Sequence, residues 1–317
     1  MFLNKIKFNY NVKILDDLIA EKNYTKILST LSNNIDNSDL FRELLNYIYS
    51  KYLSQPEHYQ LYQNKFLWVS SFDSSDSKYV LSFLNFYMSK LSQYSFESGS
   101  YKNILEECIN ALGSNNFPAK IDFSETIKNS NYYQALMLLY KNKKYLILDT
   151  EASFFEAKDN KYFIYPQSTL AYLHIVRNPL NLYKKYKEKY SSQDALNFLG
   201  SYEENTDSSQ IVIENKQNWS TNVNSWNDDN VKNAFRGKIL RYEDLILNTE
   251  ESLIEIIFHI KQSGVDIEMD YKLIESYIEN NPISEKTFED VSNQEVKKAM
   301  VNIDTNLLNE FNYDIDN

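Results

Sequence analysis

Arg177 stands at a position where an arginine can bind an anion. It follows an apolar run over residues 170–176 and precedes Asn178 and Pro179, after which an amphipathic helical pattern starts. Such a run is typical of a buried strand, and α/β folds bind ligands at the carboxyl ends of their strands. A guanidinium there presents a planar set of donors that suits a phosphate or a carboxylate. Taken alone, however, an arginine of this kind is more often an ion-pair partner or a solvated charge.

Three other apolar runs predict the strands that would lie beside the strand before Arg177. They cover residues 66–69, 145–148 and 238–240, and helical patterns separate them, among them a helix predicted over residues 78–91. Buried strands that alternate with helices form a mostly parallel sheet with helices on both faces. The sequence therefore predicts an α/β fold of three layers.

Two stretches are predicted to be helical on spacing alone. Residues 1–62 show helical periodicity without strand signals, up to a break at Pro56, and predict a helical N-terminal appendage to a domain over residues 63–317. A second helix follows the last strand, with Asn248 as its predicted cap, Glu251 three residues later and Gly264 at its end. Its predicted apolar face consists of Leu253, Ile256, Ile257 and Ile260.

Composition excludes several classes of protein. The chain has 317 residues and a formal charge of −11, from 44 acidic and 33 basic residues, which argues against a nucleic-acid backbone as the main partner. Its one cysteine, Cys108, forms no intramolecular disulfide and fits a reducing compartment. No apolar run reaches the roughly 20 residues of a membrane span, and the first residues lack a signal-peptide core. We therefore expect a cytoplasmic protein with no membrane partner, and no metal site, because three scattered histidines and one cysteine give no ligand spacing.

Three further segments follow Arg177 in order along the chain. Trp219, Val223 and Trp226 fall on one face of a helix, and the strings Leu240-Arg-Tyr-Glu-Asp-Leu245 and Lys286-Thr-Phe-Glu-Asp-Val291 come later. Together with Ile175-Val-Arg-Asn-Pro179, this order resembles the cytosolic-type sulfotransferase family, from about residue 65 to the C-terminus. Any one string is weak evidence, whereas four in order at suitable separations indicate the P-loop-like three-layer fold of that family.

The resemblance implies a donor nucleotide. The family transfers a sulfuryl group from 3′-phosphoadenosine 5′-phosphosulfate to an alcohol, phenol or amine. It implies a 3′-phosphate contact at Arg177 and adenine contacts at Tyr242 and Phe288, and these residue types suit a phosphate and a purine. Lys185 stands where the family has a second 3′-phosphate ligand, a serine. The expected cofactor is this donor or its product, 3′-phosphoadenosine 5′-phosphate.

The phosphosulfate loop departs from the family pattern. The family string Tyr-Pro-Lys-Ser-Gly-Asn-Thr-Trp corresponds to residues 72–79, which places Ser74, Ser75 and Ser77 in the loop. The loop lysine is replaced by Ser74. The loop glycine is replaced by Asp76, which with Asp73 adds negative charge beside the expected phosphate. Lys78 is a candidate replacement cation, and the alternative is an ordinary solvated lysine.

The general base of the family is also missing. Thr150 occupies the position of the family histidine, and a threonine is no base near neutral pH. Asp149 and Glu151 are the candidate bases, although carboxylates after a strand are more often caps or turn formers. His174 and His259 are expected to be packed inside elements, and His58 does not fill the role either. The glycine-containing segment that closes over the 3′-phosphate in the family is absent.

Two functions are compatible with this pattern. One is a sulfotransferase with impaired catalysis that uses Lys78 and Asp149 or Glu151. The other is a non-catalytic binding or interaction module on the sulfotransferase fold, with a protein partner bound through the helices of residues 1–62. A nucleotide triphosphatase is set aside, because the run at 145–149 lacks an accompanying Gly-x4-Gly-Lys-Ser/Thr loop. The acceptor stays open.

Overall fold

A five-stranded parallel sheet forms the centre of the molecule, with strand order β2-β3-β1-β6-β7. The computed structural model describes residues 2–21, 24–34, 66–90, 95–111, 145–156, 168–200, 218–284, 291–301 and 303–313 and the single positions 40, 43, 44, 47, 48, 134, 137, 141, 161, 162, 164 and 288. The strands are β1 (Phe66–Ser71), β2 (Phe96–Ser100), β3 (Tyr145–Thr150), β6 (Thr169–Val176) and β7 (Gly237–Arg241).

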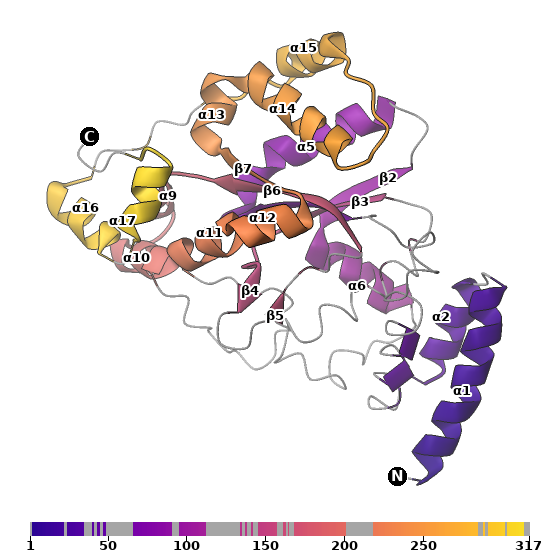
Figure 1. Ribbon diagram of the computed structural model, residues 1–317. Coiled ribbons are helices and arrows are strands. Elements are labelled where there is room, and N and C mark those ends of the chain that lie inside the picture. The colour runs from indigo at the N-terminus through magenta and orange to yellow at the C-terminus, as the bar shows by residue number, and fades with distance from the viewer. Residues whose placement is uncertain are drawn as a thin grey trace.

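Helices cover both faces of the sheet, which confirms the predicted three-layer α/β fold (Figure 1). One layer contains α5 (Ser74–Lys90), α13 (Tyr242–Leu247), α14 (Thr249–Gln262) and α15 (Tyr271–Asn280). The opposite layer contains α6 (Tyr101–Ala111), α11 (Trp219–Asn227) and α12 (Asp229–Phe235).

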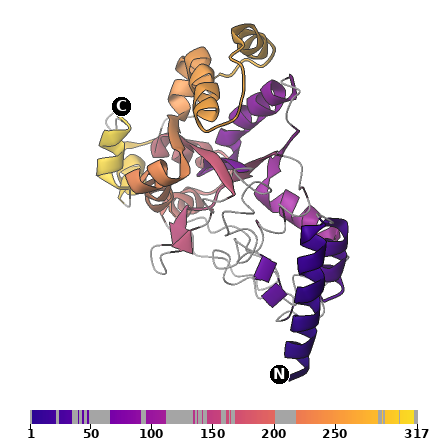
Figure 2. The same ribbon diagram turned by 45° about the vertical axis from the view of Figure 1, so that its right-hand side comes forward.

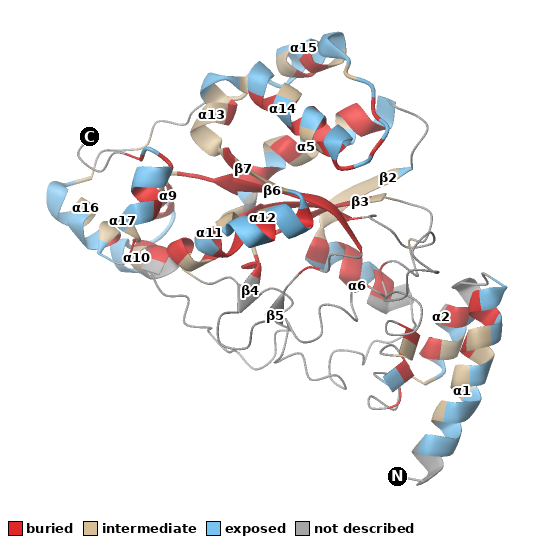
Figure 3. Ribbon diagram, viewed as in Figure 1, coloured by how far each residue is buried: buried red, intermediate tan, exposed pale blue. Residues whose placement is uncertain are grey.

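The central strand β1 is buried on both faces because its side chains alternate between the two layers. Phe66 and Trp68 belong to the core on the side of α6 and α12, whereas Leu67 and Val69 belong to the core on the side of α5 and α14. A strand that is buried on both faces has no polar positions to alternate with apolar ones. The neighbouring strand β6 is buried in the same way and is drawn red in Figure 3, and this burial explains why both strands follow continuous apolar runs in the sequence.

A third group of helices closes the carboxyl end of the sheet. It consists of α9 (Pro179–Lys187), α10 (Ser192–Gly200), α16 (Asn293–Met300) and α17 (Thr305–Glu310). Their apolar side chains form a separate core with Phe72 and Val176, the residues at the ends of β1 and β6. These helices therefore surround the edge at which the predicted site lies.

The N-terminal region contains α1 (Phe2–Ala20) and α2 (Tyr24–Ser32), which lie side by side in both ribbon views (Figures 1 and 2). Leu15 and Leu18 of α1 and Ile27 of α2 are buried. A small antiparallel pair, β4 (Phe155–Glu156) with β5 (Lys161–Tyr162), lies apart from the main sheet. His58 and the polar segment of residues 201–209 lie outside the described residues.

All four predicted strands are confirmed, and several other elements differ from expectation. The edge strand β2 was not predicted. Helix α5 begins at Ser74 rather than at Lys78, so the predicted loop serines lie in its first turn. A short helix, α13, precedes α14, and Asn248 between the two makes no side-chain capping bond. The four predicted apolar residues of α14 are buried, and Gly264 follows the helix with a φ of 102°.

Candidate functional site

The predicted site residues lie at the carboxyl edge of the sheet. Residues 74–78 follow β1, residues 149–151 stand at the end of β3, Arg177 follows β6, and Tyr242 follows β7. Because parallel strands end at one edge, four segments that are distant in the sequence meet there. Lys185 enters from α9, and Phe288 from the segment between α15 and α16.

Arg177 occupies the centre of this edge and is 5% exposed. Its Nη1 atom donates to Oδ1 of Asp76 at 2.8 Å, and Asp76 is almost completely buried as well. Its Cζ atom lies 4.3 Å from the ring centroid of Tyr242 and 5.5 Å from that of Phe288. Three of the residues predicted to hold the nucleotide thus come together, but Arg177 is already in an ion pair with Asp76.

Lys185 is also paired with the turn after β1. Its Nζ atom lies 2.9 Å from Oδ2 of Asp73 and 3.4 Å from Oδ1 of Asp76, and it contacts Oγ of Ser75. The hydroxyl of Tyr186 donates to Asp73 at 2.7 Å. Burial alone would raise the pKa of Asp73, but the charge and hydrogen bond of Lys185, with Tyr186, hold it below its usual range. Asp73 is therefore ionised at neutral pH.

Backbone amides of this turn are hydrogen-bonded within the turn. The amide of Ser75 donates to Oδ1 of Asp73 at 2.8 Å, and the amide of Asp76 donates to the carbonyl of Asp73 at 2.9 Å. An anion site at a helix N-terminus depends on amides that point at the ligand. Here the carboxylate of Asp73 takes the place of such a ligand for Ser75.

Asp149, a predicted general base, accepts a hydrogen bond from Oγ of Ser77 at 2.5 Å. Burial raises the pKa of Asp149 to about 6, with Ser77 opposing the shift, Glu151 adding to it and Lys78 opposing it. Lys78 itself is exposed on α5. Asp149 therefore combines a position at the sheet edge with a pKa close to that of a proton acceptor working near neutral pH.

Thr150 and Glu151 have structural contacts. The buried Oγ1 of Thr150 accepts from the amide of Ala152 at 3.1 Å, which is a turn interaction. The carbonyl of Glu151 accepts from Nδ2 of Asn222 at 3.0 Å. Neither contact brings these side chains to Arg177.

Other residues support the site without having been predicted for it. Nε1 of Trp219 donates to the carbonyl of Arg177 at 3.2 Å, and Glu243 accepts from the amide of Asn178 at 3.0 Å. The hydroxyl of Tyr313 lies 3.0 Å from both the carbonyl of Val176 and Oε2 of Glu243. Trp219 and Glu243 lie within strings that carried the resemblance, whereas nothing in the sequence singles out Tyr313 or Tyr186.

His174 is packed, as predicted, whereas His259 on α14 is half-buried. His174 is completely buried, lies against the ring of Trp226 with centroids 5.7 Å apart, and has its Nδ1 atom 2.7 Å from Oγ of Ser70. Burial lowers the pKa of His174 to about 3, so its ring is neutral. Nε2 of His259 lies 2.9 Å from the carbonyl of Arg236.

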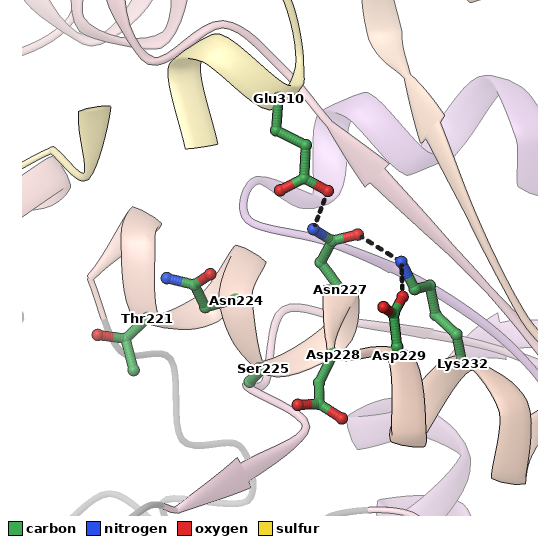
Figure 4. Close-up of a pocket in the computed structure, with 8 residues that line it drawn as sticks. All are labelled: Thr221, Asn224, Ser225, Asn227, Asp228, Asp229, Lys232 and Glu310. Carbon is green, nitrogen blue, oxygen red and sulfur yellow. Dashed lines mark hydrogen bonds and ion pairs between the residues drawn. The ribbon is translucent and has the colours of Figure 1, made fainter. Parts of the chain in front are cut away.

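A cavity of about 460 Å³ lies at the junction of α11 and α12, away from these residues. It is lined by polar side chains, which Figure 4 shows: Thr221, Asn224, Ser225, Asn227, Asp228, Asp229, Lys232 and Glu310. Asn227 bridges Glu310 of α17 and Lys232 of α12 through contacts of 2.7 and 3.2 Å. No predicted site residue lines this cavity.

Comparison with protein-family models gives no match, and comparison with curated proteins gives no significant match. Among the described residues, no group of three or more His, Cys, Asp or Glu side chains is arranged to hold a metal ion. Within the same part of the chain, no helix has the length and apolar character needed to cross a membrane.

Proposed function

We propose that the protein is a sulfotransferase-fold protein that retains the nucleotide-holding side of a 3′-phosphoadenosine 5′-phosphosulfate site and has impaired sulfuryl transfer. The single observation that carries this proposal is the convergence of Arg177, Tyr242 and Phe288, from three separate segments, at the carboxyl edge of the sheet. A guanidinium next to two aromatic rings provides hydrogen-bond donors for a phosphate and ring faces on which a purine can stack.

Impaired transfer follows from what surrounds Arg177. Preorganised donors for developing charge commonly contribute about 10²–10³ each to the rate. Ser74 replaces the loop lysine of the family, and Asp73 and Asp76 add negative charge next to the expected phosphosulfate. A non-catalytic module that binds the nucleotide or a partner is the second candidate, favoured by the ion pairs that Asp73 and Asp76 form with Lys185 and Arg177.

Titration of the protein with 3′-phosphoadenosine 5′-phosphate, followed by calorimetry, tests nucleotide binding. We expect weak binding that Lys185→Ala reduces further. Lys187→Ala is the matched control, because Lys187 lies on the same helix and pairs with Glu295 instead. Absence of any heat at millimolar nucleotide would contradict the proposal.

Transfer of labelled sulfate from the donor to a panel of phenols tests catalysis. We expect turnover at background, because the loop cation and the histidine base of the resembling family are both replaced. Measurable turnover that Lys78→Ala abolishes would instead identify an active enzyme with a relocated cation.

A further inference from the structure

Residues 73–76, here called the 73–76 turn, carry two carboxylates that form ion pairs with the cations of the candidate site. Asp76 forms an ion pair with Arg177, and Asp73 forms one with Lys185, so two carboxylates of the chain pair with two cations. Both cations lie in the part of the chain that follows β6, Arg177 in the connection and Lys185 on α9, whereas both carboxylates follow β1. When both carboxylates are ionised, the four side chains together carry no net charge, whereas a phosphate ester needs a positive site.

The fit between Asp76 and Arg177 is incomplete. Only Nη1 of Arg177 makes a hydrogen bond with Asp76, and the buried Nε atom has no hydrogen-bond partner among the described residues. A guanidinium binds best when two of its N–H groups point at two oxygens of one anion. A buried donor without a partner is costly, and it leaves Arg177 with an N–H group that an oxygen of another anion can accept.

The carboxylates that contact Lys185 could also be replaced by the oxygens of a phosphate. Its Nζ atom lies 2.9 Å from Oδ2 of Asp73 and 3.4 Å from Oδ1 of Asp76, and therefore bridges the two carboxylates. Arg177 contacts the same Oδ1 atom of Asp76, so the two cations lie close together. A dianion with three terminal oxygens, such as a phosphate monoester, could contact both cations at once. It could do so only if the carboxylates of the turn moved away, because a phosphate in contact with both cations would lie next to these carboxylates and their negative charges would repel it.

We propose that the 73–76 turn is an autoinhibitory contact, which rests on the function proposed above: Asp73 and Asp76 hold Lys185 and Arg177 in the place of a phosphate monoester, and such a ligand binds by displacing them. The 73–76 turn then blocks the phosphate site in the free protein and moves away when the ligand binds. Displacement of the turn breaks the hydrogen bond from the backbone amide of Ser75 to Asp73. Ligand binding is therefore coupled to the conformation of the first turn of α5.

Inorganic phosphate is the simplest probe of the contact. We expect the double variant Asp73→Asn/Asp76→Asn to bind phosphate about tenfold or more tightly than the wild-type chain, since it removes two negative charges from the site. Asp17→Asn, an exposed position on α1, is the control for net charge and should leave phosphate affinity unchanged. Adding Arg177→Gln to the double variant should remove the gain. Equal affinity of the double variant and the wild type would overturn the proposal.

Hydrogen exchange on the wild-type chain gives a second readout that needs no variant. Saturating phosphate should change the exchange rate of the Ser75 amide, because its acceptor Asp73 leaves. Phosphate binding with unchanged exchange across the 73–76 turn would show that the cations were accessible from the start and would overturn the contact.

Comparing inorganic phosphate with 3′-phosphoadenosine 5′-phosphate separates this proposal from the proposed function. If the double variant gains phosphate affinity but prefers the nucleotide no more than phosphate itself, the autoinhibitory contact stands and the nucleotide assignment fails. If the wild type binds the nucleotide tightly and the double variant gains nothing, the nucleotide assignment stands and the contact fails.

Discussion

Asp149 is a carboxyl group held partly away from water at the end of β3. It has one short hydrogen bond, from Ser77, and the nearby Glu151 adds negative charge. A raised pKa means that the folded chain binds a proton more tightly than the unfolded chain does. The stabilising effect of this proton is complete below the ordinary pKa of 3.8 and is lost as the pH rises through about 6.

Replacing Asp149 with asparagine should therefore flatten the pH dependence of stability. The amide keeps an oxygen for Ser77 and carries no charge to be buried. We expect Asp149→Asn to be more stable than the wild type at pH 7 by roughly 1–3 kcal/mol, and to lose this advantage near pH 4. Urea unfolding at several pH values between 4 and 7.5 measures the difference. The control Asp17→Asn should follow the wild-type curve, and an Asp149→Asn curve parallel to it would contradict the raised pKa.

The residue types at the candidate site were predictable, but their partners were not. The sequence placed Asp73 and Asp76 beside the expected phosphate and indicated repulsion. It did not indicate that Asp76 pairs with Arg177, because the two residues are 101 positions apart and meet only when β1 and β6 are neighbours in the sheet. Spacing along one element can be read from a sequence, whereas pairing between elements depends on strand order.

Among the elements, β7 begins with a glycine that the neighbouring strand requires. A Cβ atom at Gly237 would collide with the ring of Tyr172 in β6. That ring is fully buried and cannot easily move, since its hydroxyl donates to the carbonyl of Trp226 at 2.5 Å. The start of β7 therefore depends on the absence of a side chain.

Gly237→Ala should destabilise the protein by roughly 1–3 kcal/mol through overpacking. Gly99→Ala is the matched control in another strand, where the nearest atom to the added Cβ is the flexible Cδ1 of Ile104 at 3.3 Å. We expect the control to change stability by less than about 0.5 kcal/mol. Chemical denaturation of both variants makes the comparison, and equal losses would argue against a special role for Gly237.

Element prediction succeeded where burial produced a pattern and failed where it did not. Strands β1, β3 and β6 are buried and apolar, so their runs are visible in the sequence. The edge strand β2 reads Phe-Glu-Ser-Gly-Ser, pairs with β3 alone and is only half-buried, so no apolar run announces it. The first turn of α5 was predicted as a loop because its serines and aspartate favour turns as well as helix starts.

At the scale of the whole molecule, the N-terminal helices share a core with the sheet. Leu15 of α1 and Ile27 of α2 belong to one cluster of buried side chains with Trp68 of β1 and Leu105 of α6. A shared apolar core couples the stability of the parts that build it. The predicted boundary near residue 62 therefore need not be a boundary in unfolding.

Leu15→Ala tests this coupling. The substitution removes a fully buried side chain and should cost about 2–5 kcal/mol. If α1 and the sheet unfold together, the single unfolding transition moves to lower denaturant concentration and keeps its slope. Leu247→Ala, at a position 76% exposed on α13, is the control and should leave the midpoint in place. A separate early transition in Leu15→Ala would show that residues 1–62 unfold independently.

The buried pair of Asp76 and Arg177 restricts which substitutions either position can accept. Removing one partner of a buried ion pair typically costs about 3–5 kcal/mol, which is a large part of the 5–15 kcal/mol that holds a protein folded. A glycine at position 76, as in the family that the chain resembles, would leave Arg177 without its acceptor. A neutral residue at position 177 would leave Asp76 with Lys185 alone, at 3.4 Å. Neither change is neutral by itself, so the residue at each of the two positions constrains which residue the other position can hold.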